Sequence, residues 1–91
     1  MDRKHMNIRV LGRVQGVSYR VSARHQANAL GLVGFVRNEP DGSVYIEVEG
    51  TTDNIGIFLE WCRVGPPPAV VTSCETEESH IKHFPDFSIQ R

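Results

Sequence analysis

Polar and apolar side chains alternate from residue 5 to residue 14, the first patterned stretch of the chain. A period of two predicts a strand with one face buried and the other in solvent. The buried face would carry Met6, Ile8, Val10, Gly12 and Val14. Apolar residues then recur at helical spacing up to Gly31, a residue type that favours the end of a helix. The apolar positions of this helix are Val17, Val21, Ala23, Ala27 and Leu30.

The middle of the chain predicts a hairpin followed by a second helix. Two strand-like runs, residues 33–38 and 44–49, flank a turn cluster at residues 39–43. An apolar stripe at positions i, i+3, i+4 and i+7 comes next and indicates a helix. The stripe consists of Ile55, Phe58, Leu59 and Cys62. N-cap candidates precede the stripe at residues 50–53, and Gly65 with the three prolines behind it ends the helix.

The last third of the chain predicts a strand, a loop and a short strand. Residues 69–76 are rich in β-branched side chains but alternate unevenly, which indicates a bulge or an edge position. Residues 77–83 are polar and predict a loop, and residues 86–90 predict a short final strand. This order of elements is typical of an α+β, ferredoxin-like split βαβ sandwich, a mostly antiparallel sheet with two helices on one face. Because a crossover helix links the first two strands, they would run parallel and end at the same edge of the sheet.

Composition adds few constraints but argues against several classes of protein. The 91 residues suit a single domain, residues 1–91, and the formal net charge of −1 argues against a nucleic-acid-binding protein. No apolar stretch approaches the ~20 residues of a membrane helix. We therefore expect a soluble, cytoplasmic monomer with neither nucleic acid nor a membrane as a partner. Cys62 and Cys74 are interpreted as small buried apolar residues, with a disulfide between them as the alternative.

The bend between the first strand and the first helix is a candidate anion site. Residues 12–20 read Gly-Arg-Val-Gln-Gly-Val-Ser-Tyr-Arg. The first amides of a helix lack intrahelical acceptors and lie at the positive end of the helix dipole, so together with a glycine bend they suit an anion. Arg20 in the first turn is electrostatically unfavourable unless an anion meets it, and its forked guanidinium suits a phosphoryl group. On this stretch alone, a plain glycine turn beside a solvated arginine is an equally good interpretation.

Two long motifs at this separation resemble signatures of the acylphosphatase family. The first is the stretch 12–20, and the second, residues 34–44, reads Gly-Phe-Val-Arg-Asn-Glu-Pro-Asp-Gly-Ser-Val. The resemblance extends from about residue 7 to residue 89. The chain departs from the family pattern in having Tyr19 where phenylalanine is usual and Phe35 where tryptophan is common. These exchanges concern packing rather than chemistry, and a buried Tyr19 hydroxyl would need a hydrogen-bond partner.

The resemblance implies an enzyme that hydrolyses the carboxyl–phosphate bond of acyl phosphates and releases inorganic phosphate, with no cofactor and no metal ion. It implies that the Arg20 guanidinium and the backbone amides of six residues hold the phosphoryl group. These residues are Gln15, Gly16, Val17, Ser18, Tyr19 and Arg20. Asn38, at the end of the second predicted strand, would orient the attacking water, so Arg20 and Asn38 are the expected catalytic residues.

Structural interpretations stand beside these roles. An asparagine before a turn is common because it bonds its own backbone, and a non-catalytic anion-binding or regulatory module of the same fold is the alternative function. His80 and His83 have a metal-like spacing, but they lie in a polar segment without a further well-placed ligand. We expect His25 at the surface, and Trp61, beside the apolar stripe of the second helix, to have a packing role.

Overall fold

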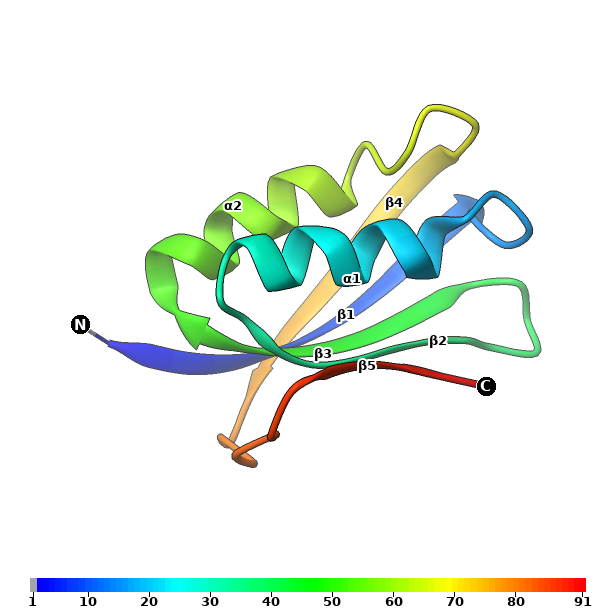
Figure 1. The fold of residues 1–91 in the computed structure, drawn as a ribbon. Coiled ribbons are helices and arrows are strands. Elements are labelled where there is room, and N and C mark those ends of the chain that lie inside the picture. Colours follow the sequence, from blue (N-terminus) through cyan, green and yellow to red (C-terminus); the bar gives the residue numbers. More distant parts are fainter. Residues whose placement is uncertain (1) are drawn as a thin grey trace.

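The structure, a computed structural model, describes residues 2–91. Five strands and two helices follow one another in this part of the chain, in the order that the sequence predicts (Figure 1). Their bounds are β1 Arg3–Arg13, α1 Tyr19–Ala29, β2 Val33–Asn38, β3 Val44–Thr51, α2 Thr52–Cys62, β4 Val70–Ser79 and β5 Phe87–Gln90. Within residues 2–91, no helix has the length and apolar character needed to cross a membrane.

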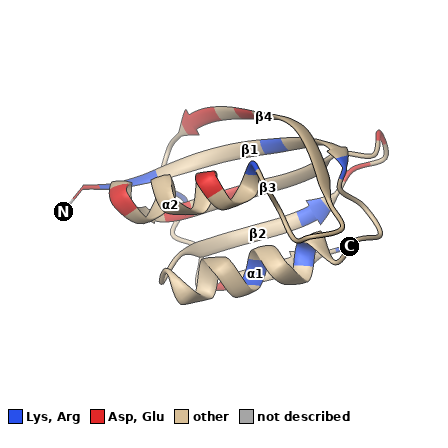
Figure 2. Ribbon diagram, turned by 90° about the horizontal axis from the view of Figure 1, so that it is seen from above, with Lys and Arg blue, Asp and Glu red and all other residues tan. Residues whose placement is uncertain are grey.

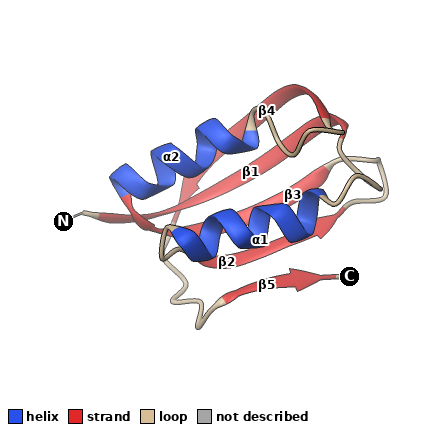
Figure 3. Cartoon of the chain, turned by 45° about the horizontal axis from the view of Figure 1, so that its top comes forward, coloured by secondary structure: helices blue, strands red, loops and turns tan. Residues whose placement is uncertain are grey.

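The five strands form one sheet in the order β4-β1-β3-β2-β5, and both helices pack on the same face of it (Figures 1 and 3). Neighbouring strands are antiparallel except β2 and β5, which are parallel. The predicted α+β, ferredoxin-like sandwich is therefore confirmed. Since β1 and β2 both run antiparallel to β3, they are parallel to each other and end at the same edge. The β1–α1 loop, the β2–β3 turn and the C-terminus lie together at that end (Figure 1).

The hydrophobic core lies between the sheet and the two helices. The period of two in the strands sends one set of side chains into it, such as the fully buried Ile8 of β1 and Ile46 of β3. The first helix contributes Ala23 and Ala27, whose small side chains let it approach the sheet closely, and the second contributes Phe58. Each large apolar side chain buried in this way stabilises the fold by roughly 1.5–3 kcal/mol. This packing fixes α1 on the sheet and thereby the start of the helix beside the strand ends.

Tyr19, the first residue of α1, is buried, and its hydroxyl has a partner. The hydroxyl donates to the Cys62 carbonyl at the end of α2, 2.7 Å away. The ring packs against Trp61, with 5.2 Å between the ring centroids, which gives Trp61 the packing role expected of it. Burial, together with the contacts to Cys62, raises the pKa of Tyr19, so the hydroxyl remains a donor. The tyrosine at this position ties the start of one helix to the end of the other.

The last strands differ from the sequence-based prediction in one respect. β4 continues to Ser79, so the predicted loop is wrong for residues 77–79, which pair with β1 as far as His5. Because β4 is an edge strand with mostly exposed side chains, polar residues are well tolerated there, and the apolar pattern does not mark its end. The predicted irregularity is confirmed, since the register between β1 and β4 shifts between Leu11 and Gly12.

Both cysteines are free. Cys62 is buried in the core, as predicted, whereas Cys74 on β4 is only partly buried and packs against the edge of the core. Burial raises the pKa of both thiols. Neither side chain is therefore a thiolate at neutral pH, and neither has the environment of a reactive cysteine.

Candidate active site

In the β1–α1 loop, residues 14–18, left-handed backbone conformations alternate with ordinary ones. Gly16 and Ser18 have positive φ values of 74° and 62°, while the residues between and beside them do not. Such alternation curls a backbone so that successive amides point toward one spot. Glycine adopts this conformation freely, whereas in Ser18 it costs roughly 1–2 kcal/mol. The bend also delays the start of α1 to Tyr19, two residues after Val17, the first apolar position of the predicted helix.

The amides of this loop and of the first turn of α1 have no hydrogen-bond acceptor within residues 2–91. The N-cap residue, Ser18, makes no side-chain capping bond, and the first turn contains no acidic residue. Farther along α1, the Ser22 amide is the first that does have an acceptor, the Ser18 carbonyl at 3.1 Å. The unpaired donors lie at the positive end of the dipole of an 11-residue helix. This arrangement suits an anion.

Gln15 ties the loop to the β2–β3 turn. Its Nε2 donates to the Glu39 carbonyl at 2.8 Å and to the Ser43 carbonyl at 2.9 Å. Asp41 closes the turn, because its Oδ1 accepts from the amide and the hydroxyl of Ser43. These hydrogen bonds also lower the pKa of Asp41, so the carboxylate stays charged. The loop is thus held beside the end of β2 by a side chain that the sequence marks only as part of the loop.

Arg20 lies in the first turn of α1, and its guanidinium reaches the end of β5. One Nη nitrogen donates to the Gln90 carbonyl, 3.2 Å away. Among residues 2–91, Arg20 has no ion-pair partner, so its charge adds to the positive end of the helix dipole. Arg24 follows one turn later, and α1 has no acidic residue, whereas α2 carries Asp53 and Glu60 without a lysine or arginine (Figure 2).

Asn38 ends β2 and lines the same small pocket as Arg20, a pocket of about 110 Å³. Its lining consists of Val14, Gly16, Ser18, Tyr19, Arg20, Val21 and Asn38. Of the residues expected to hold a phosphoryl group, only Gln15 and Val17 do not line it. The carboxamide oxygen of Asn38 is buried without a hydrogen-bond partner in the described part of the chain. Leaving a buried acceptor without a hydrogen bond costs about 1–3 kcal/mol of folding free energy. A polar group that enters the pocket could donate a hydrogen bond to this oxygen and recover that cost.

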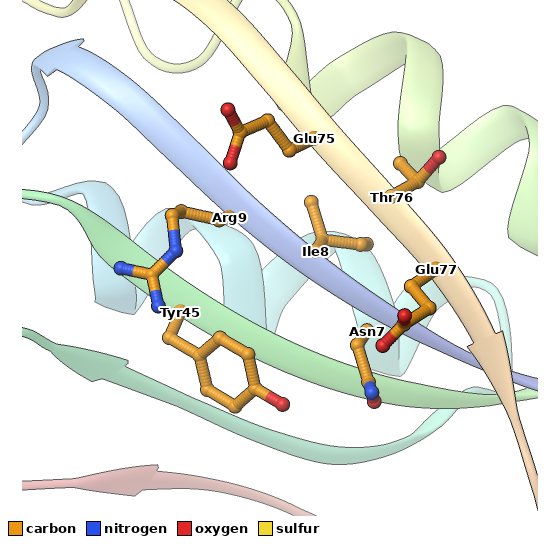
Figure 4. Close-up of a pocket in the computed structure, with 7 residues that line it drawn as sticks. All are labelled: Asn7, Ile8, Arg9, Tyr45, Glu75, Thr76 and Glu77. Atoms are coloured by element: carbon orange, nitrogen blue, oxygen red, sulfur yellow. The ribbon is translucent and has the colours of Figure 1, made fainter.

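The other candidate residues lie away from this pocket. His80 and His83 are exposed between β4 and β5, and His25 is exposed on α1. In the stretch 2–91, no group of three or more His, Cys, Asp or Glu side chains is placed to hold a metal ion. A second pocket, of about 230 Å³, lies on the sheet face opposite the helices (Figure 4). Its lining includes Arg9 and Glu77 but none of the loop amides, so it does not extend the candidate site.

Comparison with known proteins identifies the family. The acylphosphatase family model matches residues 6–89. The chain belongs to the acylphosphatase family. An acylphosphatase of Methylococcus capsulatus is 45% identical over 89 residues, which make up 97% of each chain. The acylphosphatase structure from Coxiella burnetii matches with a TM-score of 0.95 at 36% identity, covering 98% of this chain and 94% of that one. The acylphosphatase structure from Bacillus subtilis matches with a TM-score of 0.93 at 35% identity, covering 96% and 98%.

In this member of the acylphosphatase family, Arg20→Ala should weaken the binding of inorganic phosphate. Losing one charge-assisted contact is expected to cost about 1.5–3 kcal/mol of binding free energy. Arg20→Lys should restore only part of it, because lysine lacks the forked guanidinium. Phosphate titrations followed by backbone amide chemical shifts measure both effects, with Arg24→Ala as the matched control on the same helix. Shifts that cluster elsewhere, with the loop amides unmoved, would show that the loop is not an anion site.

Proposed function

We propose that this protein is an acylphosphatase that hydrolyses the carboxyl–phosphate bond of acyl phosphates, without a metal ion, to a carboxylate and inorganic phosphate. One observation carries the proposal: the buried, unpartnered oxygen of Asn38 shares a small pocket with Arg20 and the amides that precede α1. The pocket therefore combines donors suited to a phosphoryl group with an acceptor suited to a water molecule. The identity of 45% with a protein named acylphosphatase, over nearly the whole chain, supports the same reaction.

In this proposal, the amides from Gln15 to Arg20 and the Arg20 guanidinium hold the phosphoryl group. Phosphoryl transfer spreads negative charge over the equatorial oxygens, and its catalysis depends mainly on positioning and electrostatic stabilisation. The Gln15 side chain holds the loop, and the Gln90 carbonyl holds the guanidinium. Donors fixed in advance need no reorganisation during the reaction, so they stabilise the developing charge more effectively than mobile ones.

Asn38 orients the attacking water. A carboxamide cannot take a proton at neutral pH, but its oxygen can accept a hydrogen bond from water and its nitrogen can donate one. A water held by the Asn38 oxygen keeps a lone pair free to attack phosphorus in line with the departing carboxylate. The new bond forms between the water oxygen and phosphorus, the bond between phosphorus and the acyl oxygen breaks, and a phosphoryl oxygen takes the proton. Since a carboxylate is a stable leaving group, the reaction needs no general acid.

The positive charge in the pocket supports a reaction without a metal ion or another cofactor. In many phosphoryl-transfer enzymes, metal ions neutralise the charge that develops on the phosphoryl oxygens. Here Arg20 and the loop amides supply that charge. We further propose that the protein acts in the cytoplasm as a monomer on small acyl phosphates. The small volume of the pocket, about 110 Å³, supports small acyl phosphates as substrates.

A non-catalytic anion-binding module is the alternative. Such a module would need the loop amides and Arg20, but it would gain nothing from leaving the Asn38 oxygen buried without a partner. That oxygen favours an enzyme over a binding module.

Hydrolysis of benzoyl phosphate should exceed the spontaneous rate and should persist in EDTA. A phosphate monoester should remain intact under the same conditions, because its alkoxide leaving group needs an acid that the proposed site does not provide. Release of inorganic phosphate from both compounds, with and without EDTA, measures this. Benzoyl phosphate that decays only at its spontaneous rate would favour the binding module. Activity that disappears in EDTA and returns with a divalent cation would contradict the metal-free mechanism.

Asn38→Ala should lower kcat on the order of 10²-fold or more, because it removes a preorganised polar contact that acts mainly on the way to the transition state. The inhibition constant of phosphate should change little, since the phosphoryl oxygens are held by other groups. Steady-state kinetics with phosphate as the competitive inhibitor separate the two quantities.

Asn38→Asp serves as the control, because it keeps the side-chain shape but brings a negative charge near an anionic substrate. It should weaken phosphate binding as well as turnover. Near-normal turnover in Asn38→Ala would argue against a water-orienting role. A loss of phosphate affinity in step with turnover would identify Asn38 as a direct phosphate ligand instead.

A further inference from the structure

A buried polar network lies on the sheet face opposite the helices, near the end of the sheet that lies away from the candidate site. His5 of β1 is 0% exposed and Glu49 of β3 is 1% exposed. The Nδ1 of His5 is 2.7 Å from a Glu49 oxygen. Its Nε2 is 2.7 Å from the Asn7 side-chain oxygen and 3.0 Å from a Glu47 oxygen. The ring is thus held on both sides, and it holds Glu49 in one orientation.

Glu49 binds the backbone of the connection between β4 and β5. One of its oxygens accepts from the Phe84 amide at 3.2 Å, and the other accepts from the Lys82 amide. The Phe84 ring lies over His5, with 5.9 Å between the centroids. Burial alone would raise the pKa of Glu49, but the hydrogen bonds from the Lys82 amide, His5 and the Phe84 amide outweigh it and lower the pKa. The carboxylate is therefore charged at neutral pH, and its contacts are charge-assisted.

The β4–β5 connection, which Glu49 binds, leads directly into β5, the strand that contacts Arg20. The Asp86 carbonyl accepts from the Gly34 amide at 2.8 Å, and β5 then pairs with β2 up to Gln90. β5 has only four residues and a neighbour on one side only. A strand this short gains little from its own ladder, so its path depends on how its start is fixed as well as on the packing of Phe87 and Ile89 against the core. At its other end, the Gln90 carbonyl accepts from Arg20.

We propose that Glu49, oriented by His5, is a positioning residue for Arg20: it fixes segment 82–84 and so the path of β5, whose Gln90 carbonyl orients the guanidinium. The inference rests on the role of Arg20 in phosphate binding that the proposed function includes. Apolar residues of similar size often stabilise a fold as well as a buried charged pair does. What this network supplies in addition is direction, because one carboxylate holds two amides, those of Lys82 and Phe84, in a connection that has no regular structure.

Glu49→Gln tests this inference, because it keeps the side-chain size but turns one acceptor oxygen into a donor. The dissociation constant of inorganic phosphate should rise roughly 2- to 30-fold, the range seen when a residue acts through others. The side-chain Nε–Hε resonance of Arg20 should shift. Glu77→Gln is the matched control, since Glu77 is an exposed carboxylate on the same face of the sheet (Figure 4). It should change neither quantity.

The same substitution in an Arg20→Ala background separates positioning from a general loss of structure. If Glu49 acts through Arg20, then Glu49→Gln should cause no further rise in the phosphate dissociation constant there. An equal rise in both backgrounds would overturn the inference. So would a lower melting temperature with unchanged phosphate binding and an unchanged Arg20 resonance. If Glu49→Gln does not fold, His5→Gln takes its place, with a smaller rise expected, and an unchanged dissociation constant would overturn the inference.

These measurements use phosphate binding and not turnover. A protein that binds phosphate at the loop but leaves acyl phosphates intact would refute the proposed function and leave this test unaffected. Phosphate that binds at the loop equally well with and without the Arg20 guanidinium would instead remove the basis of the inference.

Discussion

The backbone amides at the start of α1 converge on one spot without an acceptor in the described protein, and the rest of the site depends on that arrangement. Three unfavourable features surround it. Ser18 is held in the left-handed backbone region, which costs roughly 1–2 kcal/mol. Arg20 adds a positive charge where the helix dipole is already positive, which costs roughly 0.3–1 kcal/mol. Asn38 keeps a buried oxygen unpartnered. Local costs of this kind persist where function needs them, and an anion accompanied by a water molecule would offset those at Arg20 and Asn38.

The fold holds these groups in place with contacts from distant parts of the chain. The parallel strands β1 and β2 bring the loop and Asn38 to one edge, and the packed core keeps α1 on the sheet. Gln15 then joins the loop to the β2–β3 turn, and Gln90 holds the guanidinium of Arg20 from the last strand. The donors are consequently fixed in the free protein, which is the condition under which electrostatic stabilisation of a transition state is most effective.

The sequence predicts those parts of the site that follow from local pattern. Alternation and helical spacing give the order of the elements, and the crossover rule brings Arg20 and Asn38 to a common edge. The roles of the Gln15 and Glu49 side chains and of the Gln90 carbonyl do not follow in this way, because each depends on partners 24 to 70 positions away that share no periodic pattern. The end of β4 is missed for a different reason: an exposed edge strand can be polar on both faces.

Hydrolysis of an acyl phosphate in ¹⁸O-labelled water tests the central claim most directly, namely that a water placed by Asn38 attacks phosphorus while the loop holds the phosphoryl group. The account predicts that the label appears in inorganic phosphate and not in the carboxylate. It also predicts inversion of configuration at a phosphorus made chiral by oxygen isotopes, as a single in-line displacement requires. Label in the carboxylate would mean attack at the acyl carbon, and retention at phosphorus would mean a covalent intermediate on the protein. Either result would contradict the account.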